Sequence, residues 1–294
     1  SAPKLVYNNN IDELADAQFE DVVRALHDRL GRMGILIPTA RISEMTVSAF
    51  HYSNNIALEN GYTSQYVISE LHKINPNKWF DLSRARFTND GQSLQIYTQS
   101  HSFVIYDKIA DLIRSKKRAI DRDQTPYQLS LFDQLVKRPE SLEILRLEVR
   151  LSQKRKMNSL FHKLGFAQDP TFKDVFDASK SKTVLSHYWE SMMSGNAALL
   201  FAHALTTKEL FKQILLAHRS IKTKEAIYRL GLVELVRDGN GMRELRSILE
   251  KHAKDRTWHR RAADAKETQA ALANLKPREW YNQIQRALES YPPF

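Results

Sequence analysis

Cysteine is absent from the 294-residue chain, which excludes disulfide bonds, cysteine-ligated zinc and catalysis by a thiolate. Glycine and proline are scarce, at nine residues each, so the composition is that of an ordinary globular protein. No apolar run approaches the roughly 18 residues of a membrane helix, and the first residues lack the basic and apolar regions of a signal peptide. We therefore expect a cytoplasmic protein that has no membrane partner.

Positive charge is the most informative feature of the composition. Lys and Arg total 44 against 34 acidic residues, which gives a formal net charge of +10. A surface of this sign attracts polyanions such as nucleic acids. Many soluble proteins are basic without binding nucleic acid, so the charge alone leaves both interpretations open.

The first half of the chain alternates between strand-like and helix-like segments. Strands are expected where β-type residues lie between turn signals, at residues 41–50, 94–97, 102–106 and 145–151. In the first of these, the alternation places Ile42, Met45 and Val47 near a core. Helical patterns fit between the strands, at residues 19–32, 64–71, 108–117 and 127–135.

After about residue 170 only helices are expected, at residues 172–178, 184–193, 207–217, 223–237, 241–252, 258–275 and 277–290. The sequence thus predicts an α+β fold, in which an antiparallel sheet with helices is followed by an all-α C-terminal region. Two domains are expected, at residues 1–170 and 171–294. Residues 207–237 are compatible with a helix-turn-helix unit that contacts DNA phosphates.

The segment from Tyr97 to Leu112 carries the first candidate catalytic pair. Tyr106 emerges from a predicted strand two residues before Lys108, so a phenol and an ammonium group are expected close together. The ammonium would lower the cost of a phenolate or stabilise charge on a phosphate. Tyrosine is common in strands, however, and a lysine at a helix start is usually solvated.

Residues 145–151, with the sequence LRLEVRL, form the clearest predicted strand. Its leucines and valine face one way, and Arg146, Glu148 and Arg150 face the other. If the polar side lines a cleft, Glu148 can bind a divalent cation while the two arginines contact phosphates. The alternative is a charge ladder that only stabilises the outer face of a sheet.

Together these two motifs resemble the gene II/X family of phage and plasmid replication initiators. The likeness rests on Tyr106-Asp107-Lys108, on the strand at 145–151 and on the basic tract that follows, and it covers about residues 35–170. It implies an antiparallel sheet of the HUH-endonuclease kind and a nicking reaction that depends on Mg²⁺ or Mn²⁺. The family resemblance also implies that Tyr106 attacks a DNA phosphate, forms a 5′-phosphotyrosine and frees a 3′-hydroxyl.

The resemblance further implies the partners. They are origin DNA, single-stranded or in a supercoiled duplex, together with a helicase and a polymerase of the bacterial host. The protein is expected to act in the host cytoplasm, and a homodimer is a candidate assembly. Two alternatives stay open: a relaxase of a mobile element, which shares this chemistry, and a DNA-binding regulator that performs none.

The remaining metal ligands are less well defined by the sequence. Where family members often carry an Arg-hydrophobic-Asp strand, this chain has no Asp, so Glu44 or His51 is the candidate ligand beside Glu148. His101 and Asp107 are weaker candidates, and a lone His is more often a hydrogen-bonded structural residue. DNA phosphates are expected to contact the basic side chains of residues 146–156, namely Arg146, Arg150, Lys154, Arg155 and Lys156.

Overall fold

The computed structural model describes residues 2–7, 11–73, 85–88, 91–115, 143–194, 205–218, 220–237, 242–250 and 278–291, with short pieces between 260 and 268. Five strands form one antiparallel sheet in the order β1-β5-β4-β3-β2. The strands are β1 (Phe50–Ala57), β2 (Ala85–Thr88), β3 (Ser93–Tyr97), β4 (His101–Asp107) and β5 (Ile144–Leu151).

Helices flank this sheet and make up the described elements after β5. Before and within the sheet lie α1 (Ala2–Val6), η1 (Asp16–Gln18), α2 (Phe19–Arg32), α3 (Thr39–Ser43), α4 (Ser64–His72) and α5 (Lys108–Ser115). After it come α7 (Lys154–Lys163), α8 (Phe172–Val175), α9 (Ala178–Met193), α11 (Thr207–Ala217), α12 (Thr223–Arg237), α13 (Met242–Glu250) and α15 (Glu279–Ser290). The mixed α+β class is therefore confirmed, with an antiparallel sheet and a mostly helical C-terminal half. None of the described helices has both the length and the apolar character needed to cross a membrane.

The two faces of the sheet differ in character because successive side chains of a strand point to opposite sides. One face is apolar, and its side chains from β1, β3, β4 and β5 form the main hydrophobic cluster with helical residues. On β5 this face consists of the fully buried Leu145, Leu147, Val149 and Leu151, as the sequence predicts.

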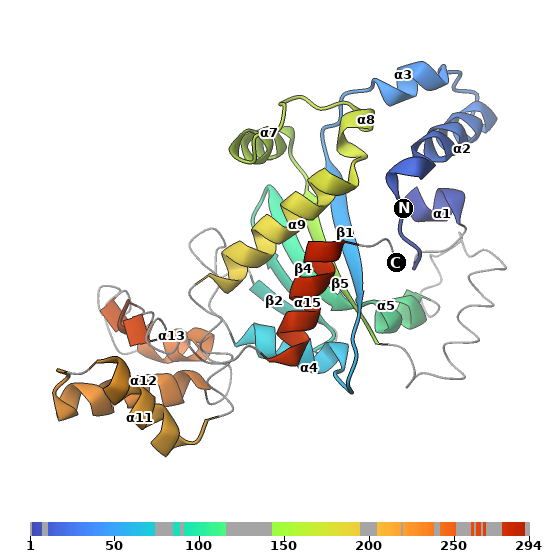
Figure 1. Cartoon of the computed structure of the whole chain (residues 1–294). Helices are drawn as coiled ribbons and strands as arrows, with labels where there is room; N and C mark the ends of the chain where they lie inside the picture. Colours follow the sequence, from blue (N-terminus) through green and yellow to red (C-terminus); the bar gives the residue numbers. More distant parts are fainter. Residues whose placement is uncertain are drawn as a thin grey trace.

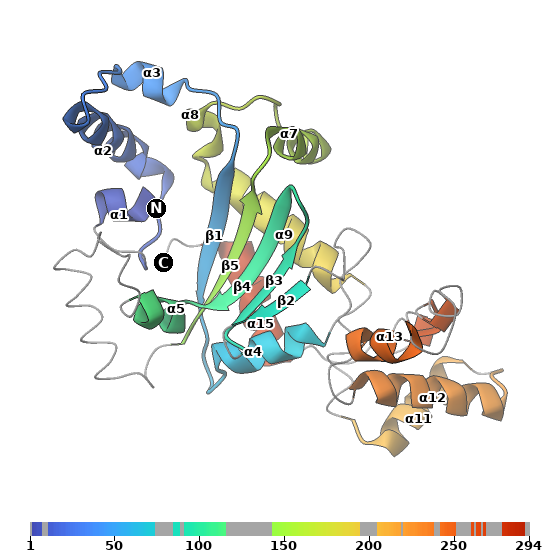
Figure 2. The same ribbon diagram turned by 180° about the vertical axis from the view of Figure 1, so that it is seen from behind.

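Helices α4, α9 and α15 cover the apolar face (Figure 1). Trp189 of α9 and Trp280 of α15 are among the largest fully buried side chains, so both helices belong to the same core as the strands. That core thus joins elements from before and after residue 170. Figure 2 looks onto the opposite face, which these helices leave uncovered.

The predicted strand at residues 41–50 is wrong. Thr39–Ser43 form the short helix α3 and the strand begins only at Phe50. Ile42 is buried, against α2, but Met45 is 43% exposed. The alternation of apolar residues in this segment therefore reflects packing of a helix and the connecting chain, for which alternation alone is an ambiguous signal.

The other predicted strands agree with β3, β4 and β5 to within one residue at each end. The predicted helices at 19–32, 207–217 and 223–237 match α2, α11 and α12. Helices α11, α12 and α13 share a second, separate hydrophobic cluster. The predicted helix at 127–135 lies outside the described residues, as does most of the one at 258–275.

Candidate active site on the polar face of the sheet

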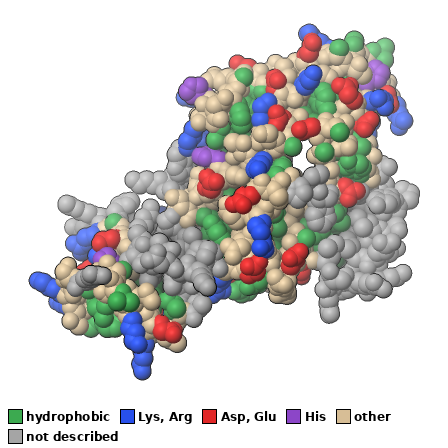
Figure 3. Space-filling model, viewed as in Figure 1, with side chains coloured by type: hydrophobic (Ala, Val, Ile, Leu, Met, Phe, Trp, Pro, Cys, Tyr) green, Lys and Arg blue, Asp and Glu red, His purple; other side chains and the backbone are tan. Residues whose placement is uncertain are grey.

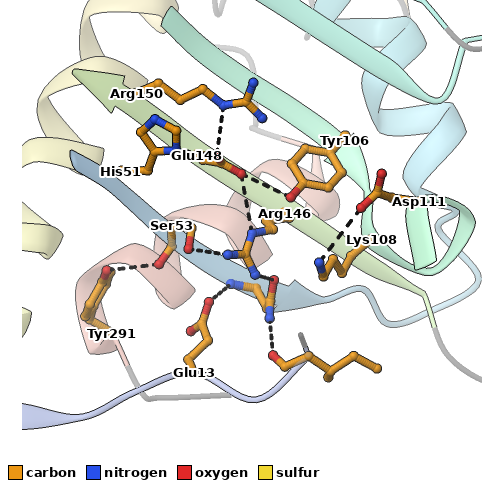
Figure 4. A network of polar contacts seen from close by, with 12 residues as sticks. Glu13, His51, Ser53, Tyr106, Lys108, Asp111, Arg146, Glu148, Arg150 and Tyr291 are labelled. Atoms are coloured by element: carbon orange, nitrogen blue, oxygen red, sulfur yellow. Dashed lines mark hydrogen bonds and ion pairs between the residues drawn. The ribbon is translucent and has the colours of Figure 1, made fainter. Parts of the chain in front are cut away.

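The polar face gathers the candidate residues of three adjacent strands in register. Arg146 of β5 lies between Asn55 of β1 and Tyr106 of β4, and the next row places Glu148 opposite Ser53. Figure 4 shows the side chains of this face pointing toward one another around the Glu148 carboxylate. The strand pairing explains the cluster, because residues directly opposite across antiparallel strands project to the same side.

Glu148 is the centre of this group, which we call the Glu148 cluster: His51, Tyr106, Arg146, Glu148 and Arg150. The Tyr106 hydroxyl donates to Glu148 Oε2 at 3.1 Å, and Arg150 Nε donates to Oε1 at 2.8 Å. Arg146 Nε lies 3.7 Å from Oε2, and His51 Nδ1 lies 3.4 Å from Oε1. Glu148 is only 7% exposed, so its carboxylate is a buried charge compensated by two guanidinium groups.

Arg146 is fixed in place from the side of β1. Its two terminal nitrogens donate to Asn55 Oδ1 at 3.1 Å and to Ser53 Oγ at 2.6 Å. Glu13 in turn accepts from the backbone N–H of Asn55 at 2.7 Å. Arg146 Nε is buried and has no hydrogen-bond partner among the described residues, which leaves one donor of the guanidinium directed at the cluster.

Charge and burial shift the acid–base behaviour of Tyr106 and Glu148 in opposite directions. Burial raises the pKa of the Tyr106 phenol, and the neighbouring Glu148 carboxylate adds to the rise, while Arg146 opposes it. Burial also disfavours the charged form of Glu148, but hydrogen bonds from His51 and Arg150 and the charges of the two arginines hold its pKa well below its usual range. In this state the phenol is protonated and the carboxylate is ionised.

Lys108 lies beside the ring of Tyr106 and not at its hydroxyl. Its ammonium is 5.9 Å from the ring centroid and 3.9 Å from Asp111 Oδ2, and the residue is 5% exposed. Asp107, which lies between Tyr106 and Lys108 in the sequence, accepts a hydrogen bond from the backbone N–H of Ala110 at 2.8 Å. Asp107 thus acts as the cap at the start of α5, which gives this acidic residue a structural role.

The predicted metal ligands are only partly brought together. His51 contacts Glu148, but Glu44 follows the end of α3, which Figure 1 shows beside α2 and beyond the end of the sheet. Within the described ranges no three His, Asp or Glu side chains are placed to hold a metal ion. A hard divalent cation needs about six oxygen ligands, and one Glu148 oxygen already accepts from Arg150. The described donor set does not fit such an ion, and we derive no chemical step through one.

The basic run at residues 154–156 divides between two surroundings. Lys154 forms an ion pair with Asp169 at 2.8 Å, and Arg155 is exposed. Lys156 lies with His101 at a small cavity between α7 and α9, on the side of the sheet that carries the helices. The run therefore does not extend the row formed by Arg146 and Arg150.

A larger cavity borders the Glu148 cluster along the outer edge of β1. Its volume is about 320 Å³, and His51, Ser53 and Arg146 contribute to its wall together with aromatic side chains from β1, α8 and the end of α15. The edge of β1 next to it is partly occupied, since Tyr291 donates to the backbone carbonyl of Ser53 at 3.4 Å. Arg146 therefore lines this cavity as well as contacting Glu148.

Three residues of this site were missed by sequence reasoning: Glu13, Ser53 and Asn55, which hold Arg146 in place. The signal available for Ser53 and Asn55 was the period of two that begins at His51. No local pattern points to Glu13, which lies 42 residues from its partner. Comparison of the chain with protein-family models, with curated proteins and with solved structures finds no match.

Proposed function

We propose that this protein nicks and rejoins one strand of DNA at a replication origin, with Tyr106 as the nucleophile. The observation that carries the proposal is the contact between the Tyr106 hydroxyl and Glu148, at 3.1 Å, within a cluster that also holds two arginines. A regulator without chemistry has no need for a tyrosine on a buried carboxylate. The +10 net charge and the resemblance to gene II/X initiators support the same function.

The proposed reaction is a transesterification. The Tyr106 oxygen forms a bond to a DNA phosphorus, the bond from phosphorus to the 3′-oxygen breaks, and the DNA stays attached through a 5′-phosphotyrosine. The phenolic proton passes to Glu148 Oε2, to which the hydroxyl already donates, and water protonates the departing 3′-oxygen. Because the covalent bond conserves the energy of the phosphodiester, the reverse reaction reseals the strand.

Arg146 and Arg150 give the step its electrostatic support. At rest they neutralise Glu148 and make it a weak base. A DNA phosphate that binds the guanidinium groups draws part of this charge away from the carboxylate and raises its pKa. The same contacts stabilise the charge that develops on the phosphate during the reaction. In this proposal Lys108, whose ammonium lies 5.9 Å from the centroid of the Tyr106 ring, positions that ring.

A covalent adduct tests the proposal directly. The protein is incubated with a pool of single-stranded and supercoiled origin candidates in Mg²⁺ or Mn²⁺, and adducts that survive boiling in detergent are sequenced. We expect an adduct linked to the 5′ end of the cut DNA, and Tyr106→Phe should abolish it without changing DNA affinity. Tyr97→Phe is the matched control, because Tyr97 belongs to the same sheet and should leave the adduct intact.

The outcomes separate the alternatives. An adduct that persists in Tyr106→Phe and disappears in Tyr97→Phe would move the nucleophile to Tyr97. Tight DNA binding without any adduct would favour the non-catalytic regulator. A relaxase of a mobile element would give the same adduct but at a transfer origin, so the sequence recovered from the adduct distinguishes it from a replication initiator.

A further inference from the structure

A second group of basic side chains lies on the other side of the sheet, at the cavity between α7 and α9. Lys156, Ser159 and Lys163 come from one face of α7, at the spacing of successive helical turns. His187 and Ser191 come from one face of α9, and His101 closes the cavity from the start of β4. Figure 3 shows basic and His side chains gathered over this part of the molecule.

The charged side chains that line this cavity are all basic. Two lysines, two histidines and two serine hydroxyls line it, and among the residues that the structure describes no acidic side chain contributes to the lining. The cavity volume is about 40 Å³, whereas a single water needs about 10–15 Å³ on the same measure. The space therefore fits one compact group of a few heavy atoms, such as a tetrahedral oxyanion.

The positive groups at this cavity destabilise one another. Burial and the charge of Lys163 lower the pKa of Lys156, and burial together with Lys163 and Lys156 lowers the pKa of His187. The positive charges of Lys156 and Lys163 on α7 and of a protonated His187 on α9 repel one another, and a bound anion reduces that repulsion. The side chain of Thr98 contacts His101 Nδ1 at 2.8 Å. His101 therefore lines the cavity as a neutral side chain and adds no positive charge to it.

We propose that Lys156, Lys163 and His187 form a binding site for a phosphate group. The lysines supply the charge, and the hydroxyls of Ser159 and Ser191 supply neutral donors for the remaining phosphate oxygens. The group can belong to the DNA backbone or to free phosphate, because both present the same oxygens. The site does not depend on the proposed function, since phosphate can bind here whether or not Tyr106 cuts DNA.

Inorganic phosphate is the first probe. The His ring signals of the full chain are followed by NMR at constant ionic strength, with chloride as the reference anion. We expect phosphate to shift the His187 signal and to raise its pKa, because a bound anion favours the imidazolium, while His27 on α2, which does not line this cavity, should not respond. Equal responses to phosphate and chloride, or no response of His187, would overturn the proposal.

Lys163→Gln tests the assignment to this cavity. Removal of one charged donor should weaken phosphate binding about tenfold or more, the usual size of a charge-assisted hydrogen bond. Lys173→Gln is the matched control, because Lys173 is exposed on the neighbouring α8 and does not line the cavity. Equal phosphate affinity in Lys163→Gln and Lys173→Gln would also overturn the site. Thermal melting of both variants confirms that they are folded.

A single-stranded oligonucleotide distinguishes the two sources of phosphate. If the group belongs to DNA, Lys163→Gln should lower oligonucleotide affinity and reduce the slope of log K against log salt by about 0.7, the value for one phosphate contact. If free phosphate is the ligand, oligonucleotide binding should be unchanged while phosphate binding falls. Either result supports the site and names its ligand.

Discussion

The two faces of β5 come from the same eight residues and differ in every physical respect. On one face, Leu145, Leu147 and Val149 are fully buried against helices. On the other, Arg146, Glu148 and Arg150 form a compensated charge cluster around a tyrosine. Burial of apolar area stabilises the fold, whereas a buried ion pair contributes little net stability. The comparison indicates that the apolar face supplies most of the stability of the sheet and that the charged residues of the polar face contribute little to it.

Leu147→Ala should produce the largest loss of stability. Leu147 is fully buried in the main cluster, and truncation of such a side chain costs about 2–5 kcal/mol. Denaturation in urea measures this change, and the folded fraction of the variant should still form the DNA adduct. A loss below about 1 kcal/mol would mean that the apolar face is less tightly packed than the structure indicates.

Glu148→Gln should cost less stability and remove the activity. The amide keeps the size of the side chain but loses a charge-assisted acceptor, so the free energy of unfolding should fall by about 1–3 kcal/mol. The DNA adduct should be lost, because the amide cannot take the Tyr106 proton. Because the described donor set does not fit a divalent cation, calorimetry should find the Mn²⁺ affinity unchanged in this variant; a weaker affinity would assign Glu148 to a metal site.

The same variant has a pH signature of defined sign. Because the folded-state pKa of Glu148 is depressed, its contribution is present above the unfolded value of about 4.3 and is lost as the pH falls toward the folded value. The stability difference between wild type and Glu148→Gln should therefore shrink below about pH 4. A difference that stays constant on acidification would contradict the depressed pKa.

His101→Gln should have a smaller effect that is confined to acid conditions. Burial, followed by the charge of Lys156, lowers the pKa of His101 from 6.5 to about 4. His101 is therefore neutral in the folded state, and its contribution is lost as the pH falls from 6.5 to about 4. Lys163 and His187 also face this cavity. Thermal melting across that interval should show a shallower decline in His101→Gln than in the wild type.

Arg150→Gln should change stability least. Its own side chain is 37% exposed, and Arg146 stays 3.7 Å from the Glu148 carboxylate. Glu148 therefore keeps one compensating charge, and the loss of stability should be about 1 kcal/mol. Its effect should appear in DNA binding, where the slope of log K against log salt falls by about 0.7–0.9. Lys173→Gln removes the same charge from an exposed position on α8 and should leave the slope unchanged.

Much of the sheet and part of the candidate site could be predicted because they depend on local alternation. The period of two in residues 145–151 separated Leu147 from Glu148 correctly, and Tyr106 was placed at the end of the adjacent strand. The position of β1 could not be predicted in this way. Asn54 and Asn55 are poor strand formers, yet both are buried in β1, where Glu13 binds the Asn55 backbone at 2.7 Å.

The sequence by itself thus determined which side chains of β5 share a face, since the pleat of any strand fixes that alternation. Only the tertiary structure decided which side chains of the neighbouring strands lie against that face. Register with β4 brings Tyr106 to Arg146 and Glu148, while register with β1 brings His51, Ser53 and Asn55 to their other side. It also turned Lys156 away from the arginines and toward α9. The contacts of Tyr106, Ser53 and Asn55 with β5 join residues 42 to 93 positions apart, and at such separations only the packed fold, not local spacing, sets which groups meet.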